Sequence, residues 1–138
     1  MAIIPQVTDL TRPYWAAARD GRLVVQRCEA CGQAWHPPLP RCPHCHSASV
    51  GWREVAGTGT VYTYTVVTHP THAALAGKVP YVVAIVELDE GPRVVTGING
   101  CAPSDVRAGM PVRVRFEAVT DEVTLPYFEP VESSHVTP

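Results

Sequence analysis

Hydrophobic and polar residues alternate over much of the second half of the chain. Pro111–Glu117 places its valines and phenylalanine on one face and its charges on the other, which is typical of a half-buried strand. Thr60–Val67 is rich in β-branched and aromatic residues. Tyr81–Leu88 is almost continuously apolar, so we expect a central strand there. Together with Arg93–Ile98 and Leu125–Phe128, these segments predict five short strands.

The number and order of these strands limit the possible folds. Five short strands with no clear helix between them are compatible with a small barrel or a sandwich. The long opening strand, a hairpin turning at Asp89–Pro92 and the late alternating strand favour a five-stranded OB-fold barrel.

A short helix is predicted near the N-terminus, over residues 8–20. Thr11 is placed to cap its start and Gly21 to end it in the left-handed conformation. A helix of this length is not stable alone in water, so it must dock on something. Its aromatic pair, Tyr14 and Trp15, either packs on this chain's own domain or presents a hydrophobic face to a partner.

Four cysteines form two Cys-x-x-Cys knuckles, Cys28/Cys31 and Cys42/Cys45, with ten residues between the pairs. Each knuckle offers two thiolates on one side of a tight turn, and two knuckles supply the tetrahedral sulfur ligands that Zn²⁺ prefers. Such a site has no open position for a substrate, so the zinc is expected to be structural. Two disulfides or an iron site are the alternatives.

The cellular context agrees with metal binding. The first residues lack the basic and long apolar regions of a secretory signal, and no run of about 18 apolar residues is present to cross a membrane. We therefore expect a cytoplasmic protein whose thiols stay reduced. Cys101 lies outside the knuckles and is expected to act as a small buried apolar residue, with a reactive thiol as the alternative.

Charge argues against nucleic acid as the main partner. Eleven basic and thirteen acidic residues among the 138 give a formal net charge of −2, whereas phosphate binders are usually basic. Single-stranded nucleic acid stacked on Tyr62, Tyr64 and Tyr81 remains a lesser alternative.

The complete pattern predicts a mainly β protein with a short N-terminal helix, a rubredoxin-like zinc ribbon and a C-terminal five-stranded OB-fold barrel. The expected division is an N-terminal helical segment at 1–22, the ribbon at 23–52 and the OB-fold domain at 53–138. A ribbon of this size cannot bury enough apolar surface to fold unaided, so the metal must contribute to its stability.

Several short sequence motifs together resemble those of a known family. They are the helix Pro13-Tyr-Trp-Ala-Ala-Ala-Arg-Asp-Gly-Arg-Leu23, the two knuckles, Gly59-Thr-Val-Tyr-Thr-Tyr-Thr65, Pro80-Tyr-Val-Val-Ala-Ile-Val-Glu-Leu-Asp-Glu-Gly91 and Gly109-Met-Pro-Val-Arg-Val114. In this order they look like the zinc-ribbon/OB-fold proteins that accompany acyl-CoA thiolases. The resemblance covers about residues 8–130.

The resemblance implies a non-catalytic subunit that stabilises a thiolase-superfamily enzyme, helps bind the acyl-CoA or links two enzymes, one of them an enoyl-CoA hydratase-like protein. Steroid side-chain, aromatic or isoprenoid-precursor metabolism is the implied setting. The residues agree on catalysis, since no nucleophile motif or phosphate loop is present and no catalytic residue is expected. Arg41 and Arg53 are candidates for coenzyme A phosphates, or else solvated surface residues. A free-standing acyl-CoA-binding module is the alternative function.

Overall fold

Two β-structures and one helix make up the described part of the computed structural model, which is residues 5–70, 73 and 76–131. A three-stranded antiparallel sheet has the order β2-β1-β3, formed by β1 (Leu23–Cys28), β2 (Ala34–Trp35) and β3 (Val50–Val55). A closed barrel has the order β4-β5-β6-β8-β7, formed by β4 (Thr58–Val67), β5 (Tyr81–Leu88), β6 (Arg93–Ile98), β7 (Pro111–Ala118) and β8 (Thr124–Pro130). The helix is α1 (Arg12–Arg19), and a 3₁₀ turn, η2, covers Pro103–Asp105.

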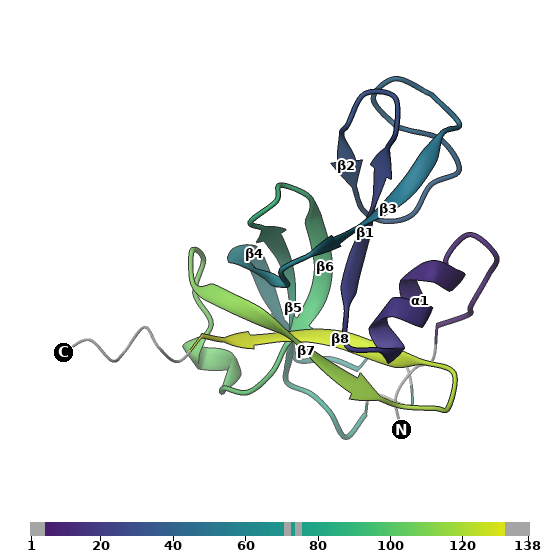
Figure 1. Ribbon diagram of the computed structural model, residues 1–138. Helices are drawn as coiled ribbons and strands as arrows, with labels where there is room; N and C mark the ends of the chain where they lie inside the picture. The colour runs from purple at the N-terminus through teal and green to yellow at the C-terminus, as the bar shows by residue number, and fades with distance from the viewer. Residues whose placement is uncertain (1–4, 71–72, 74–75, 132–138) are drawn as a thin grey trace.

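The barrel has the strand order of an OB-fold, which confirms the predicted fold class. Long antiparallel ladders join β4 to β5 and β5 to β6. The barrel closes where β6 meets β8 in parallel, through the single pair Ile98 and Phe128. Figure 1 shows the ribbon sheet projecting from one side of this barrel.

Side chains along β5 alternate between the barrel core and the outer face of the sheet. Val82, Ala84, Val86 and Leu88 are buried in the core, whereas the residues between them are only half-buried. The almost continuous apolar run predicted a central strand, and β5 does lie between β4 and β6. The described residues cover only its inner face completely.

The ribbon and the barrel share one core. Val24, Val25 and Val55 from the ribbon sheet pack in the same apolar cluster as the barrel valines and Phe128. The expected boundary between residues 52 and 53 falls inside β3, which continues to Val55. The division into 1–22, 23–52 and 53–138 stays a prediction.

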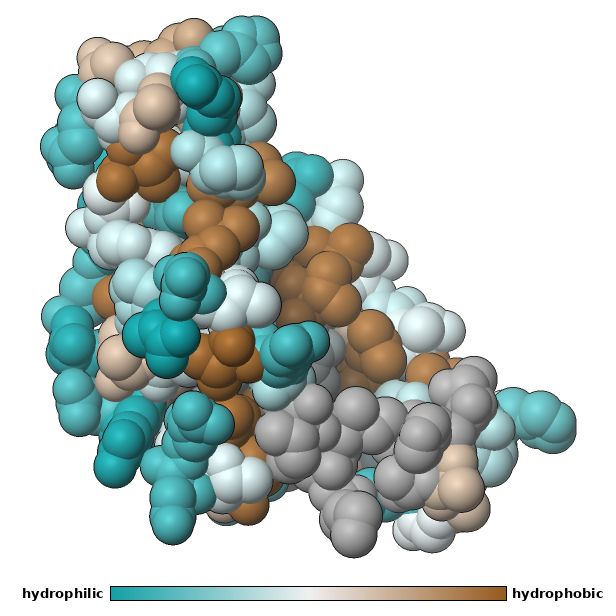
Figure 2. Space-filling model, turned by 90° about the vertical axis from the view of Figure 1, so that its right-hand side faces the viewer, coloured by the Kyte–Doolittle hydropathy of each residue, from teal (hydrophilic) through white to brown (hydrophobic). Residues whose placement is uncertain are grey.

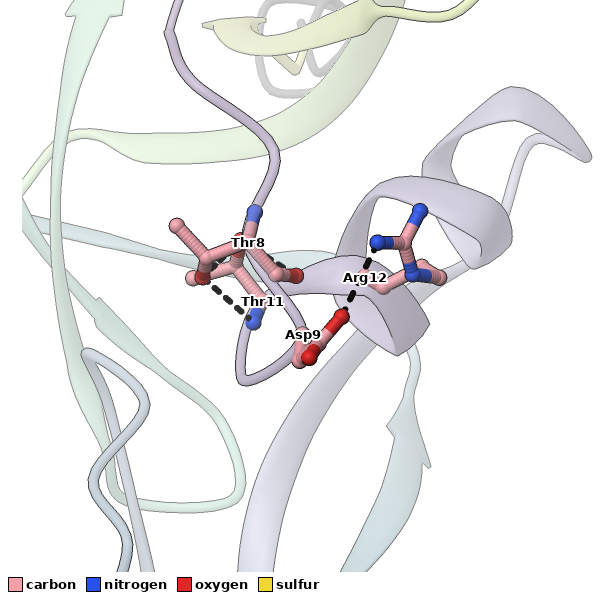
Figure 3. Close-up of polar contacts among 4 residues, drawn as sticks. All are labelled: Thr8, Asp9, Thr11 and Arg12. Atoms are coloured by element: carbon pink, nitrogen blue, oxygen red, sulfur yellow. Dashed lines mark hydrogen bonds and ion pairs between the residues drawn. The ribbon is translucent and has the colours of Figure 1, made fainter.

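Helix α1 packs against β1, β7 and β8, beside the base of the ribbon (Figure 1). Its C-terminal end is as predicted, because Gly21 has a φ of +78° and its N–H donates to the carbonyl of Ala18. At the other end the prediction is wrong in one detail. The Thr11 side chain does not cap α1; its hydroxyl oxygen instead accepts the N–H of Thr8 at 3.0 Å, in the preceding turn (Figure 3). No helix of the described residues is long and apolar enough to cross a membrane.

Candidate metal centre and partner surface

The two knuckles bring four thiols together at the tip of the ribbon. The four sulfur atoms of Cys28, Cys31, Cys42 and Cys45 all lie within 4.8 Å of one another. The Cys28 and Cys45 sulfurs are 3.5 Å apart, and those of Cys31 and Cys42 are 3.7 Å apart. A tetrahedron with Zn–S bonds of about 2.3 Å has sulfurs about 3.8 Å apart. The cluster therefore fits a structural Zn²⁺, and in this arrangement the cysteines are thiols rather than disulfides.

Backbone N–H groups prepare the first cysteine of each knuckle for metal. The N–H groups of Ala30 and Cys31 donate to Cys28 Sγ, both at 3.3 Å, and Cys42 Sγ receives two in the same way. The donor from Cys31, followed by the one from Ala30, lowers the pKa of Cys28. The N–H of Ser47 lowers the pKa of Cys45, but the Cys28 thiol, burial and the other two thiols together outweigh it and raise that pKa. Four thiolates this close need a cation to neutralise them.

A buried glutamine, which the sequence pattern did not reveal, ties the ribbon together. The Gln26 side chain is 2% exposed, and its Oε1 accepts the indole N–H of Trp35 at 2.8 Å and the backbone N–H of Leu39 at 2.5 Å. It therefore links β1 to β2 and to the proline-rich loop before the second knuckle. The only signal in the sequence is that Gln26 directly follows the apolar run Leu23–Val25.

The two arginines considered for coenzyme A lie in different surroundings. Arg53, exposed on β3, lines a polar hollow of about 410 Å³ between the first knuckle and the β5–β6 hairpin, with His44 and Glu90. Arg41 does not line this hollow, and its Nη1 donates to the carbonyl of His46 at 3.2 Å within the second knuckle. The structure thus does not bring Arg41 and Arg53 together in one hollow.

The aromatic pair of α1 is divided between core and surface. Tyr14 is 9% exposed and belongs to the chain's own core, where burial raises its pKa to about 12. Trp15 is half-buried and meets Tyr14 edge to face, with ring centroids 4.9 Å apart. The His36 ring packs against that of Tyr14, with centroids 5.2 Å apart, and its buried Nδ1 has no hydrogen-bond partner among the described residues. Burial lowers the pKa of His36 to about 4.

These aromatics line an apolar groove that reaches the barrel. The groove has a volume of about 450 Å³ and is formed by α1, the proline-rich loop, β6 and β8; its walls include Pro5, Trp15, His36, Pro37, Val95 and Leu125. Val95, at its barrel end, is 71% exposed. On the other side, Val95 also borders a second hollow over β5, with Val83, Ile85 and residues 63–65 of β4.

Val95 therefore joins two apolar hollows into one surface, here called the Val95 surface and defined by Trp15, Val83, Ile85, Val95 and Leu125. Figure 2 shows hydrophobic side chains gathered on one side of the molecule, in the hollowed region below the projecting ribbon. An exposed apolar surface bordered by polar residues is typical of an interaction site.

The remaining cysteine lies away from the metal cluster. Cys101 is half-buried and packs against the main core, as expected for a small apolar residue. Burial, followed by the nearby charge of Asp105, raises the pKa of its thiol. A raised pKa leaves less of the reactive thiolate at neutral pH.

Comparison with protein families matches both parts of the chain. Residues 15–51 match the rubredoxin-like zinc ribbon domain of ChsH2, and residues 52–117 match its C-terminal OB-fold domain. These matches confirm the resemblance that the sequence phrases indicated.

Individual relatives carry the names of subunits and scaffolds. The chain is 50% identical over 117 residues to a probable enoyl-CoA hydratase alpha subunit of Thermomonospora curvata; this alignment covers 85% of the chain but 36% of that relative. It is also 36% identical to a DUF35 domain-containing scaffold protein of Methanocaldococcus jannaschii, over 80% of the chain and 83% of the relative. The chain thus spans about a third of the first relative and most of the second.

A solved structure agrees with these relatives. It is described as an Ltp2-ChsH2(DUF35) aldolase, and it matches with a TM-score of 0.82 and 46% identity over 92% of this chain and 98% of that one. Its description names two components, so the similar chain is part of an enzyme complex. This chain therefore belongs to the ChsH2-type, or DUF35, family of zinc-ribbon/OB-fold proteins.

Proposed function

We propose that this chain is a non-catalytic accessory subunit of a thiolase-type acyl-CoA enzyme, which it stabilises while helping to bind or pass on the acyl-CoA. The observation that carries this proposal is the Val95 surface, where a 71% exposed valine joins two apolar hollows. Burial of such a surface is the main driving force of association. The subunit, scaffold and aldolase names of the relatives support assembly with an enzyme.

The chemistry of the chain supports a role without catalysis. Four of the five cysteines form the metal cluster, and the fifth, Cys101, has a raised pKa. A thiolase requires a cysteine activated as thiolate beside a base. The metal cluster is closed by four sulfurs, which leaves no position for a substrate. The reaction is therefore assigned to the partner.

The partner surface can be tested by coexpression with a thiolase-superfamily enzyme encoded beside this chain, followed by size-exclusion chromatography with light scattering. We expect one complex. Val95→Glu should weaken it at least tenfold, because a carboxylate would be buried in an apolar contact. Thr60→Glu, an exposed strand position outside the Val95 surface, is the control and should leave the complex intact. Separate elution of two folded proteins would contradict the proposal. A hydratase-like enzyme tested in the same way identifies a further partner.

The acyl-CoA role is assigned to Arg53, with Arg41 as a second contact. No ion pair of Arg53 is found among the described residues, and Arg53 lines a polar hollow of about 410 Å³, where a guanidinium can bind a phosphate group. Calorimetry with coenzyme A should show binding to the complex that weakens about tenfold to a hundredfold in Arg53→Ala, the loss expected for a charge-assisted hydrogen bond. Arg113→Ala, whose arginine pairs with Glu129, is the control.

The same calorimetry separates the two acyl-CoA functions. An accessory subunit needs its partner's surface to complete the ligand site, so the isolated chain should bind coenzyme A much more weakly than the complex. Equal affinity of the isolated chain would instead favour the free-standing acyl-CoA-binding module. No coenzyme A binding by either form would remove the ligand role and leave the assembly role standing.

A further inference from the structure

The second half of β4 lies outside the closed part of the barrel. Strand β4 pairs with β5 along almost its whole length, but with β7 only over Thr58–Thr60. Beyond Val61, whose N–H donates to the carbonyl of Met110, no strand pairs with the β7 side of β4 in the described ranges. Five consecutive residues here, 62–66, are exposed. This half of β4 is therefore an open strand edge.

The orientation of the backbone shows which groups the edge offers. In the β5–β6 hairpin the N–H of Leu88 donates to the carbonyl of Pro92, so alternate residues of β5, including Ala84 and Val82, direct their backbone groups toward β6. Tyr64 and Val66 lie opposite Ala84 and Val82. Their N–H and C=O groups therefore point away from β5, to the open side. Only another extended backbone matches such a row of donors and acceptors.

The strand's own side chains do not protect this edge, although the guanidinium of Arg93 on β6 lies 3.9 Å from the centre of the Tyr62 ring. Natural proteins usually shield an open strand with charged residues or proline. Residues 61–67 contain no charge, proline or glycine. Tyr62 is 51% exposed, Tyr64 38% and Val66 37%. A β-bulge between Val61 and Thr63 twists the strand at the start of the open stretch, and the residues from Thr63 onward pair regularly with β5. An uncharged edge with high β-propensity favours pairing with a further strand.

The sequence of the edge suits pairing with itself. Thr63-Tyr64-Thr65 reads the same in both directions, with Tyr62 and Val66 on either side. In an antiparallel pair of two copies centred on Tyr64, Tyr64 faces Tyr64 and Thr63 faces Thr65 of the other copy. Aromatic pairs and threonine pairs are both favourable across strands. The centre of such a pair is a two-fold axis, so the contact closes after two copies.

We propose that the open edge of β4 pairs with the same edge of a second copy of this chain, which gives a two-fold dimer with a continuous sheet across the interface. This inference does not rest on the proposed function, because it is argued from the backbone pairing of β4. Residues 63–65 also border the β5 hollow of the Val95 surface, but none of β4 lines the groove between α1 and the barrel, which stays free for a partner.

The dimer can be tested on the purified, zinc-loaded chain alone. Sedimentation velocity over a range of concentrations should show the mass rising from the 14.9 kDa monomer to the dimer. Tyr64→Lys places two ammonium groups directly opposite each other, and we expect the dissociation constant to rise at least tenfold. Thr60→Lys changes the same strand in its fully paired half and is the control. Melting temperatures establish that each variant is folded.

A charge-swap experiment tests the register itself. Tyr64→Lys mixed with Tyr64→Glu should restore a dimer that contains one copy of each, because the two charges then attract. Hydrogen exchange of the unmodified chain provides a second readout. The amides of Tyr64 and Val66 should gain protection with concentration, whereas those of Thr63 and Thr65 face β5 and should be protected throughout.

Three outcomes would overturn the proposal. The first is a monomer at all concentrations, and the second is a dimer that Tyr64→Lys does not weaken. The third is a monomer whose Tyr64 and Val66 amides become protected only when a partner enzyme binds. That result would assign the edge to a strand of the partner instead.

Discussion

The ribbon and the barrel are stabilised in different ways. The tip of the ribbon has a small cluster of Cys28, Trp35 and Cys42, with Val50 packed against it. The barrel has a continuous core of valines, leucine and Phe128 that extends to the base of the ribbon. The tip therefore depends on a metal, whereas the barrel depends on apolar burial. This difference predicts that the two regions respond to different perturbations, although β3 leads directly from one to the other.

Removal of the metal should produce the largest difference. Zinc contributes on the order of 10 kcal/mol to the folding of small ribbon-like domains. We expect Cys28→Ser with Cys42→Ser, or treatment with a strong chelator, to unfold the ribbon tip while the barrel remains folded. Hydrogen exchange followed by NMR measures both regions at once. Simultaneous loss of protection in β5 and β6 would show that the barrel also depends on the metal.

A cavity in the barrel should produce the reverse pattern. Phe128 is 1% exposed at the point where β6 and β8 close the barrel. Phe128→Ala should lower the free energy of unfolding by about 3–5 kcal/mol. Denaturant unfolding measures this loss. The exposed control Val95→Ala should change stability little, and the ribbon of Phe128→Ala should still bind zinc with unchanged stoichiometry.

Within the ribbon, the buried Gln26 should contribute to stability through its hydrogen bonds, in addition to the metal. Gln26→Ala leaves the indole N–H of Trp35 and the N–H of Leu39 without their acceptor. We expect a loss of about 1–3 kcal/mol in ribbon stability, visible as faster zinc release to a competing chelator. Gln33→Ala, an exposed glutamine of the same ribbon, serves for comparison. Equal release rates in the two variants would mean that the Gln26 hydrogen bonds contribute nothing.

Acid should have a smaller effect through His36, at the junction of ribbon and α1. Burial lowers its pKa to about 4, whereas an unfolded histidine titrates near 6.5. Between these values the unfolded chain binds more protons, so stability falls as the pH drops from about 6.5 toward 4. The half-buried ring should contribute about 1 kcal/mol. Protonation of the cysteines affects the unmodified chain and His36→Gln equally. Stability should therefore depend less on pH in His36→Gln than in the unmodified chain. Identical slopes in the two proteins would exclude His36 as the cause.

Features that depend on local pattern could be predicted from the sequence. The knuckle spacing predicted the four-thiol cluster, and an apolar run with the turn after it predicted the bounds of β5 and β6. The order of the strand signals predicted the barrel topology. These features are determined by neighbouring residues, which is why one sequence was sufficient.

Features that depend on distant contacts could not be predicted. Tyr14 is buried in the core that the ribbon base and the barrel share, and His36 packs against Tyr14, so neither placement is visible in the local pattern. The Val95 surface exists only because α1, the proline-rich loop and β6 meet in space. The open edge of β4 likewise depends on where β7 stops pairing.

In the proposed complex the metal holds the shape needed for assembly and takes no part in a chemical step. The most direct measurement is light scattering and turnover of the partner enzyme with the zinc-loaded chain and with Cys28→Ser/Cys42→Ser. We expect the zinc-free variant to lose the complex, while the turnover of the separated partner equals that of the enzyme prepared without this chain. A zinc-free chain that still forms the full complex with normal activity would contradict the claim.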